Sequence, residues 1–285
     1  MMSEEFTVGV KVHREWETLV ALSFSLEGIG AGLVLCAVVA GSQIAALVGL
    51  VLVAGGVAAL FAHLGNRRRF WRVVSNPATA WISRGSLLIG MLLVFGVLSL
   101  FTGQLENPPG WAPLPTLVVG LVAAILVGYA GLLLASMVGI PFWSSALVPL
   151  LFALHSLASG ATLLLALTAI TGGGTQPYPA LKAAVAVLLV LTLAASLVYP
   201  KLTGSTRAAR DSARTLLKGE HRRLFQGGAL GLGLLVPLVF VGAHHWLAPG
   251  LAASALLLVV ALLRLAGDLC FRYALITVGS YDPLL

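Results

Sequence analysis

The sequence predicts an all-α integral membrane protein with eight transmembrane helices arranged as two four-helix bundles. Of its 285 residues, 59% are hydrophobic and 9% are charged, whereas a soluble domain usually carries about a quarter charged residues. The mean hydropathy of +1.01 indicates a surface that faces lipid rather than water. The charged residues also gather in a few short segments between long apolar runs, which is typical of a chain that crosses a membrane repeatedly.

Eight apolar segments reach the roughly 20 residues that a membrane span needs. They are residues 16–40, 43–64, 80–102, 114–137, 144–170, 179–199, 225–246 and 249–275. Gly41–Gln43 predicts a tight turn, and the basic segment 201–223 is expected to be partly helical, with Ser205 as N-cap. A faint similarity between residues 21–28 and 153–160 divides the chain into two halves of four spans, 1–140 and 141–285.

The basic residues predict the orientation. Eight spans place both termini on one side of the membrane, here called side A, together with the segments around residues 65–79, 138–143 and 200–224. Most of the Lys and Arg residues lie on side A, including Arg67, Arg68, Arg69 and Arg72, whereas the opposite loops hold Lys182 alone. The positive-inside rule therefore predicts a multi-pass protein of the inner, cytoplasmic cell membrane with side A in the cytoplasm.

Few ionisable groups lie inside the spans, and such groups are functional candidates because they are costly in lipid. They are Glu27, Arg84, His155, Arg264, Asp268 and Arg272, with Tyr129 as a hydroxyl and His63 at the end of a span. At 1.5 Å per residue, Glu27, His155 and Arg264 lie roughly 16 Å deep. Asp268 and Arg272 are also spaced to pair on one helix face, so a purely structural ion pair is the alternative for them.

Several kinds of site are not expected. Of the six histidines only His155 is deep, so a haem held by two histidines is not predicted. Cys36 and Cys270 lie in apolar runs without metal-ligand spacing, so no metal site is predicted. No hydrolytic triad or phosphate-binding loop is present either.

Motifs along almost the whole chain match one family in order. They include Leu26–Gly32 after Trp16, His63–Gly65, Asn76–Pro77 with Trp81 and Arg84, Tyr129–Leu133, Gly139–Trp143, Leu147–Phe152 with Ser159–Gly160, and Ala266–Asp268 with Arg272. With these motifs, the chain resembles the NrfD-like membrane subunits of complexes of the polysulfide reductase and DMSO reductase type.

The resemblance implies a haem-free subunit that reacts with quinone, either menaquinone or ubiquinone, in the first four-helix bundle. It implies an iron–sulfur partner subunit and, through it, a molybdopterin catalytic subunit. In the family, an asparagine and a histidine of the first span and a tyrosine of the fourth bind the headgroup. Tyr129 matches that tyrosine, whereas Val20 and Ser23 stand at the other two positions.

The expected quinone site is therefore Ser23, Glu27, His63, Arg84 and Tyr129, with Glu27 as proton acceptor and Tyr129 as its catalytic partner. His155, Arg264, Asp268 and Arg272 are expected to form a proton relay. The arginines 67, 68, 69 and 72 are expected to dock the iron–sulfur subunit. In better-known relatives that docking side commonly lies outside the cytoplasm, which conflicts with the orientation that the positive-inside rule favours.

Two other functions use the same residues. A small secondary transporter or proton-conducting channel is one alternative, although the prolines Pro149 and Pro237 do not match the paired helix breaks expected of transporters. A purely structural anchor, in which Glu27 and Tyr129 only pack, is the other.

Overall fold

A computed structural model describes residues 11–12, 16, 18–64, 67–171, 178–204, 206–243 and 251–281. In this part of the chain, eight segments are long and apolar enough to cross a membrane. The prediction of an all-α, multi-pass membrane protein is therefore confirmed, and the ends of the spans fall within a few residues of those expected.

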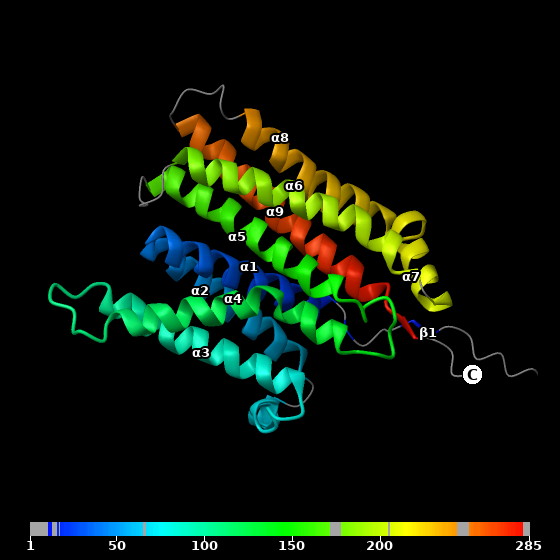
Figure 1. Ribbon diagram of the computed structural model, residues 1–285, viewed down its shortest axis with the longest axis horizontal. Helices are drawn as coiled ribbons and strands as arrows, with labels where there is room; N and C mark the ends of the chain where they lie inside the picture. The colour runs from blue at the N-terminus through cyan, green and yellow to red at the C-terminus, as the bar shows by residue number, and fades with distance from the viewer. Residues whose placement is uncertain are drawn as a thin grey trace, which may run out of the picture.

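The elements follow in chain order, and Figure 1 shows their arrangement. They are β1 (Lys11–Val12), α1 (Thr18–Ala40), α2 (Gln43–His63), η1 (Arg67–Val74), α3 (Trp81–Thr102), α4 (Pro113–Ala135), α5 (Leu147–Thr171), α6 (Tyr178–Leu202), α7 (Arg207–Lys218), η2 (Arg223–Leu235), α8 (Val236–Ala243), α9 (Leu251–Thr277) and β2 (Ser280–Tyr281).

Helices α1 and α5 lie side by side at the centre (Figure 1). Their crossing depends on small residues, because a Cβ on Gly160 would lie 2.3 Å from the carbonyl carbon of Gly32, and one on Gly32 would lie 2.2 Å from the oxygen of Ser156. Such close approach is how membrane helices gain packing energy without a hydrophobic driving force. Helices α2, α4 and α9 also pack against α1, and α6 and α9 pack against α5.

Contacts among α1 to α4, and among α5, α6, η2, α8 and α9, follow the two expected halves. However, α1 also contacts α5 and α9, and α4 contacts α5. The division into two bundles at residue 140 therefore stays a prediction.

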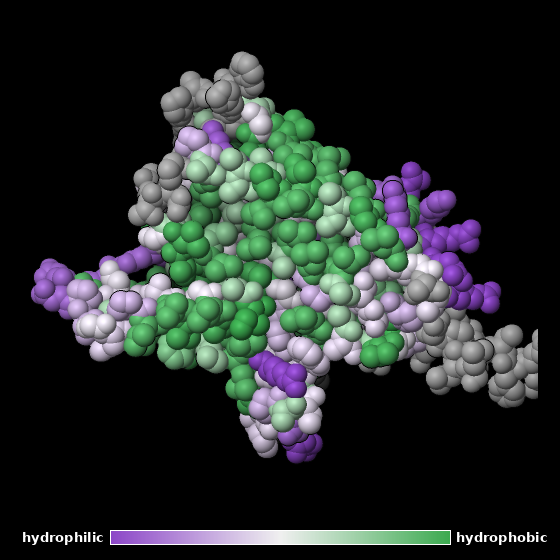
Figure 2. Space-filling model, in the orientation of Figure 1, coloured by the Kyte–Doolittle hydropathy of each residue, from purple (hydrophilic) through white to green (hydrophobic). Residues whose placement is uncertain are grey.

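The surface separates into an apolar band and polar ends. Figure 2 shows hydrophobic residues across the helices and hydrophilic residues over α7 and η1. Large side chains in mid-span are exposed, such as Val94 at 66% and Leu121 at 60%, which fits contact with lipid. Lys11 and Val12 pair antiparallel with Tyr281 and Ser280, so the two ends of the described chain lie together beside α7 (Figure 1).

The seventh span is not a regular α-helix. Residues Arg223–Leu235 form a π-helix, and an α-helix continues from Val236. Val236 donates its backbone N–H to Gly231, five residues back. The next residue is Pro237, which has no N–H to donate, so the change in hydrogen-bond pattern falls where the ladder is already interrupted.

Two basic segments on side A contain helices. The segment 201–223 contains α7, as expected, but its N-cap is Thr206, whose hydroxyl accepts from the N–H of Ala209 at 3.2 Å, whereas Ser205 lies outside the described residues. The arginine-rich segment after α2 forms the short 3₁₀ helix η1.

Candidate functional site

A cavity of about 270 Å³ lies among α1, α2, η1, α3 and α4. Most of its wall is apolar and includes Trp16, Phe24 and Leu133. Glu27, His63 and Tyr129 contribute polar atoms to the same wall. A mainly apolar cavity with a few converging polar groups is the usual form of a small-molecule site.

Glu27 reaches the cavity from the middle of α1. The Ser23 hydroxyl, one helical turn earlier, donates a hydrogen bond of 2.8 Å to its Oε1 atom. Gly56 of α2 makes room for this side chain, since a Cβ there would lie 2.6 Å from Cγ of Glu27. The carboxyl group is thus held toward the cavity by its own helix and by the neighbouring one.

Tyr129 of α4 lines the same cavity as Glu27. It is only 8% exposed, and its hydroxyl donates to the backbone oxygen of Trp81 at the start of α3. Its ring lies against Gly85, where a Cβ would come within 2.5 Å of Cε1. Since that donation uses the phenol proton, the oxygen of Tyr129 keeps lone pairs free to accept a hydrogen bond from a ligand.

His63 and Arg84 have different positions relative to the cavity. His63, the last residue of α2, lines the cavity with an exposed side chain. Arg84 does not line it: its guanidinium donates to the backbone oxygens of Pro77 at 2.8 Å and Ala78 at 2.6 Å. It also stacks 5.0 Å from the centre of the Trp81 ring. Arg84 therefore holds the segment between η1 and α3 in place beside Tyr129.

Helix η1 connects the cavity to the side-A surface. Val73 lines the cavity, whereas the neighbouring Arg72 and the nearby Arg69 are exposed. The side chains of Arg67 and Arg68 lie outside the described residues. The exposed arginines of the expected docking surface and a residue of the cavity wall thus lie on the same short helix.

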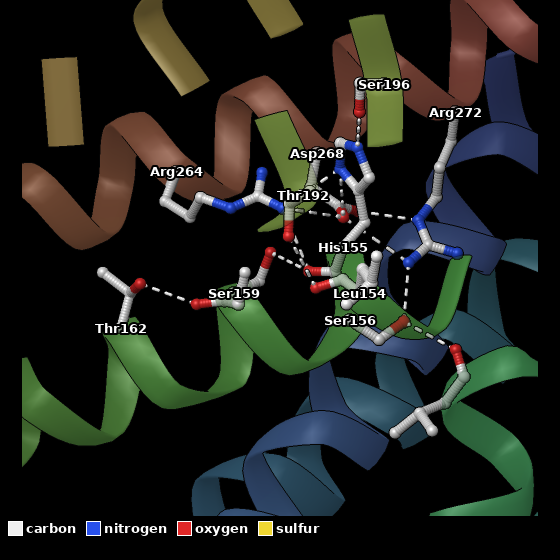
Figure 3. Close-up of polar contacts among 12 residues, drawn as sticks. Leu154, His155, Ser156, Ser159, Thr162, Thr192, Ser196, Arg264, Asp268 and Arg272 are labelled. Atoms are coloured by element: carbon white, nitrogen blue, oxygen red, sulfur yellow. Dashed lines mark hydrogen bonds and ion pairs between the residues drawn. The ribbon is translucent and has the colours of Figure 1, made fainter. Parts of the chain in front are cut away.

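A second polar site lies between α5 and α9, close to α1, and is shown in Figure 3. We call it the arginine cluster. Its members are His155, Ser156, Arg264, Asp268 and Arg272, and all are 0% exposed. The structure thus brings together the four residues expected to form a proton relay and adds Ser156.

Asp268 and Arg272 are the closest charged pair of the cluster. The Nε atom of Arg272 donates to Oδ2 of Asp268 at 2.7 Å, and Nη2 donates to Oγ of Ser156 at 2.9 Å. Ser156 in turn donates to the backbone oxygen of Val127 in α4 at 2.9 Å. The chain of contacts therefore runs from α9 through α5 to the helix that carries Tyr129.

Arg264 and His155 form the other part of the cluster. Nη2 of Arg264 lies 3.1 Å from Nδ1 of His155 and 3.7 Å from Oδ1 of Asp268. Because a guanidinium can only donate, Nδ1 must accept, and the His155 proton lies on Nε2, which is 3.0 Å from the Ser196 hydroxyl. Phe271 stacks on the imidazole at 3.6 Å between ring centres and fixes its plane.

Sequence reasoning missed the hydroxyls around the cluster. Thr192 and Ser196 of α6 are buried, and Thr192 bonds to the backbone oxygens of Leu188 and Leu154. Their spacing of four residues in an apolar span was the available signal, because it places both on one helix face.

A search of curated proteins finds no match. A family model described as polysulphide reductase, NrfD, matches residues 10–281, which is nearly the whole chain and includes both polar sites. By this match and by its eight apolar spans, the chain belongs to the polysulphide reductase NrfD family.

Proposed function

We propose that this chain is the quinone-reactive membrane subunit of a multi-subunit respiratory oxidoreductase. It would pass electrons between the quinone pool and an iron–sulfur subunit, which connects it to a molybdopterin catalytic subunit. Members of the NrfD family are membrane subunits of such quinone-linked complexes. The observation that carries the proposal is the apolar cavity that brings Glu27, His63 and Tyr129 together.

The cavity suits a planar, mostly apolar ring with two oxygens at its edge. Its volume of about 270 Å³ lies just below the roughly 300–1,000 Å³ of most small-molecule sites. Aromatic and aliphatic side chains would hold the faces of the ring, while Glu27 and Tyr129 lie on different helices and could each meet a ring oxygen. A bound quinone would supply the chemistry of two electrons and two protons.

The protein groups would handle the protons. Glu27 would accept a proton, and its hydrogen bond from Ser23 stabilises the charged carboxylate. His63 stands between the cavity and the exposed end of α2, so it would pass protons toward side A. Arg84 would act by positioning the segment beside Tyr129 and not by touching the ring.

The electrons need an acceptor close to the cavity. The exposed arginines of η1 adjoin the cavity through Val73, and a basic surface suits an acidic face on an iron–sulfur partner. In the second half of the chain, His155, Arg264, Asp268 and Arg272 would form a proton relay. The positive-inside rule still favours side A in the cytoplasm, and a reporter fused to the C-terminus tests that orientation.

Turnover of the assembled complex with quinol tests the proposal. We expect Glu27→Gln and Tyr129→Phe each to lower quinol-linked turnover about 100-fold or more, the range of a positioned acid or base. Glu106→Gln is the matched control for the first, since Glu106 is exposed in the loop after α3. Tyr199→Phe is the control for the second, because Tyr199 is buried and also donates to a backbone oxygen, that of Phe142, far from the cavity.

The outcome separates the three candidate functions. If both cavity variants keep wild-type turnover in a fully assembled complex, the quinone assignment is wrong. Quinone that co-purifies with the wild type, but not with the cavity variants, supports the assignment. Proton leak through the purified protein in vesicles, without a partner or quinone, would instead support the channel.

A further inference from the structure

The arginine cluster has an imbalance of charge. It contains two guanidinium groups, those of Arg264 and Arg272, and a single carboxylate, that of Asp268. All three side chains are fully buried in helices that cross the membrane. A net charge in such a place is expensive unless an opposite charge lies nearby. The cluster therefore needs a second negative group.

Some guanidinium nitrogens of the cluster also lack partners. Among the described residues, no hydrogen-bond acceptor reaches Nη1 of Arg272, or Nε and Nη1 of Arg264. Buried donors are almost always satisfied. Figure 3 shows that the Nη1 side of Arg272 points away from Asp268, so this donor faces toward something other than its paired carboxylate.

Helix α1 carries a second carboxyl group. Within the described spans, the acidic side chains are Asp268 and Glu27. The guanidinium of Arg272 lies directly against α1 at Gly28, the neighbour of Glu27: a Cβ there would be 2.5 Å from Nη2 and 3.0 Å from Cζ. Gly28 thus lets the guanidinium of Arg272 pack against α1 one residue away from Glu27, whose carboxyl belongs to the cavity.

The helices around α1 and the cavity carry other titratable and charged groups. They are His63 on α2, Arg84 on α3, Tyr129 on α4, His155 on α5, and Arg264, Asp268 and Arg272 on α9. Of these, His63 and Tyr129 line the same cavity as Glu27, and the guanidinium of Arg84 donates to backbone oxygens. Arg272 does not line the cavity, and it reaches α1 at Gly28.

We propose that Arg272 is a positioning residue shared by two carboxylates, Asp268 in the cluster and Glu27 at the cavity, and that it links the two sites electrically. This inference rests on the proposed quinone site and extends it. With Glu27 charged, the two arginines are balanced by two carboxylates. When Glu27 takes up a proton, the balance is lost, and the field at His155 and Arg264 changes. Proton transfer at the cavity would thereby change the electrostatic field at the residues of the relay.

A double-mutant cycle on the purified, quinone-free subunit tests the link. Glu27→Gln and Arg272→Gln are each expected to lower the midpoint of thermal unfolding. Since each removes the partner of the other, the double variant should fall by clearly less than the sum of the two losses. The control cycle pairs Arg272→Gln with Glu106→Gln, an exposed carboxyl, and should be additive. Additive losses in the test cycle would overturn the proposal.

Infrared spectroscopy gives a second readout, the C=O band of protonated Glu27. This band would not change if Arg272 only stabilised the fold. The C=O band of protonated Glu27 is identified by its loss in Glu27→Gln. At a fixed pH this band should grow in Arg272→Gln, because the carboxylate loses its cation, and Arg272→Lys should restore the wild-type intensity. An unchanged band in Arg272→Gln would overturn the proposal.

Two features keep the test decisive. If Arg272→Gln does not insert, Gly28→Ala replaces it, because the added methyl group takes the place of the guanidinium; the band should then grow, and an unchanged band counts against the link. Neither readout uses quinone or a partner. If the double-mutant cycle shows coupling but Glu27→Gln keeps normal turnover, the quinone site is rejected and the link is supported. If the cycle is additive but Glu27→Gln lowers turnover, the link is rejected and the quinone site is supported.

Discussion

Asp268→Asn should be among the most destabilising conservative changes in this protein. Asp268 is fully buried, with one oxygen 2.7 Å from Nε of Arg272 and the other 3.7 Å from Nη2 of Arg264. Two unit charges about 4 Å apart attract by about 4 kcal/mol at an effective dielectric constant of about 20. Asparagine keeps the shape of the side chain but removes its negative charge. The buried guanidinium groups of Arg264 and Arg272 then have no carboxylate beside them. Breaking a buried pair in this way typically costs about 3–5 kcal/mol.

Unfolding by SDS in mixed micelles, followed by tryptophan fluorescence, measures this loss. The matched control is Asp211→Asn on α7, where the side chain is exposed, and where a change within about 0.5 kcal/mol is expected. A loss below about 1 kcal/mol for Asp268→Asn, with the control unchanged, would refute the reasoning. It would mean that Asp268 does not compensate the arginines in the folded protein.

Three further predictions concern packing, hydrogen bonding and docking. Gly160→Val should prevent the close crossing of α1 and α5 at Gly32 and lower the yield of folded protein in detergent, measured by size-exclusion chromatography. Ser156→Ala should cost about 1–3 kcal/mol in the same SDS titration, because it leaves buried polar partners unpaired. Reversing the charge of the exposed Arg69 and Arg72 should weaken capture of the iron–sulfur subunit at low salt while membrane insertion stays normal; equal capture would contradict docking by η1.

The spans were predictable because lipid imposes a strong requirement. Every backbone group in the membrane must be bonded within its own helix, so a span appears as a long, uninterrupted apolar run. The few polar exceptions, such as Glu27, Tyr129 and Asp268, were visible for the same reason. Depth along each helix was also accessible, since it follows from counting residues.

The rotation of each helix was not predictable. In a soluble helix the polar face shows which side is buried, but in these spans leucine serves equally against lipid and against protein. Ile82 is 49% exposed and yet lines the cavity, whereas Leu92 on the same helix is fully buried. For this reason the sequence could not predict that the Arg84 side chain points toward the backbone oxygens of Pro77 and Ala78.

The position of Arg272 could not be derived from its spacing to Asp268 alone. That i, i+4 spacing fits a neutral pair that closes on itself, and such a pair would need nothing from α1. What changes the interpretation is Arg264, one turn before Asp268, which makes the positive charge exceed the negative charge on a single helix. The three charged residues of α9 thus leave one positive charge without a negative partner on that helix, and the guanidinium of Arg272 packs against α1 at Gly28. The excess charge on α9 is therefore the physical reason to treat the cavity and the arginine cluster as one electrostatic unit.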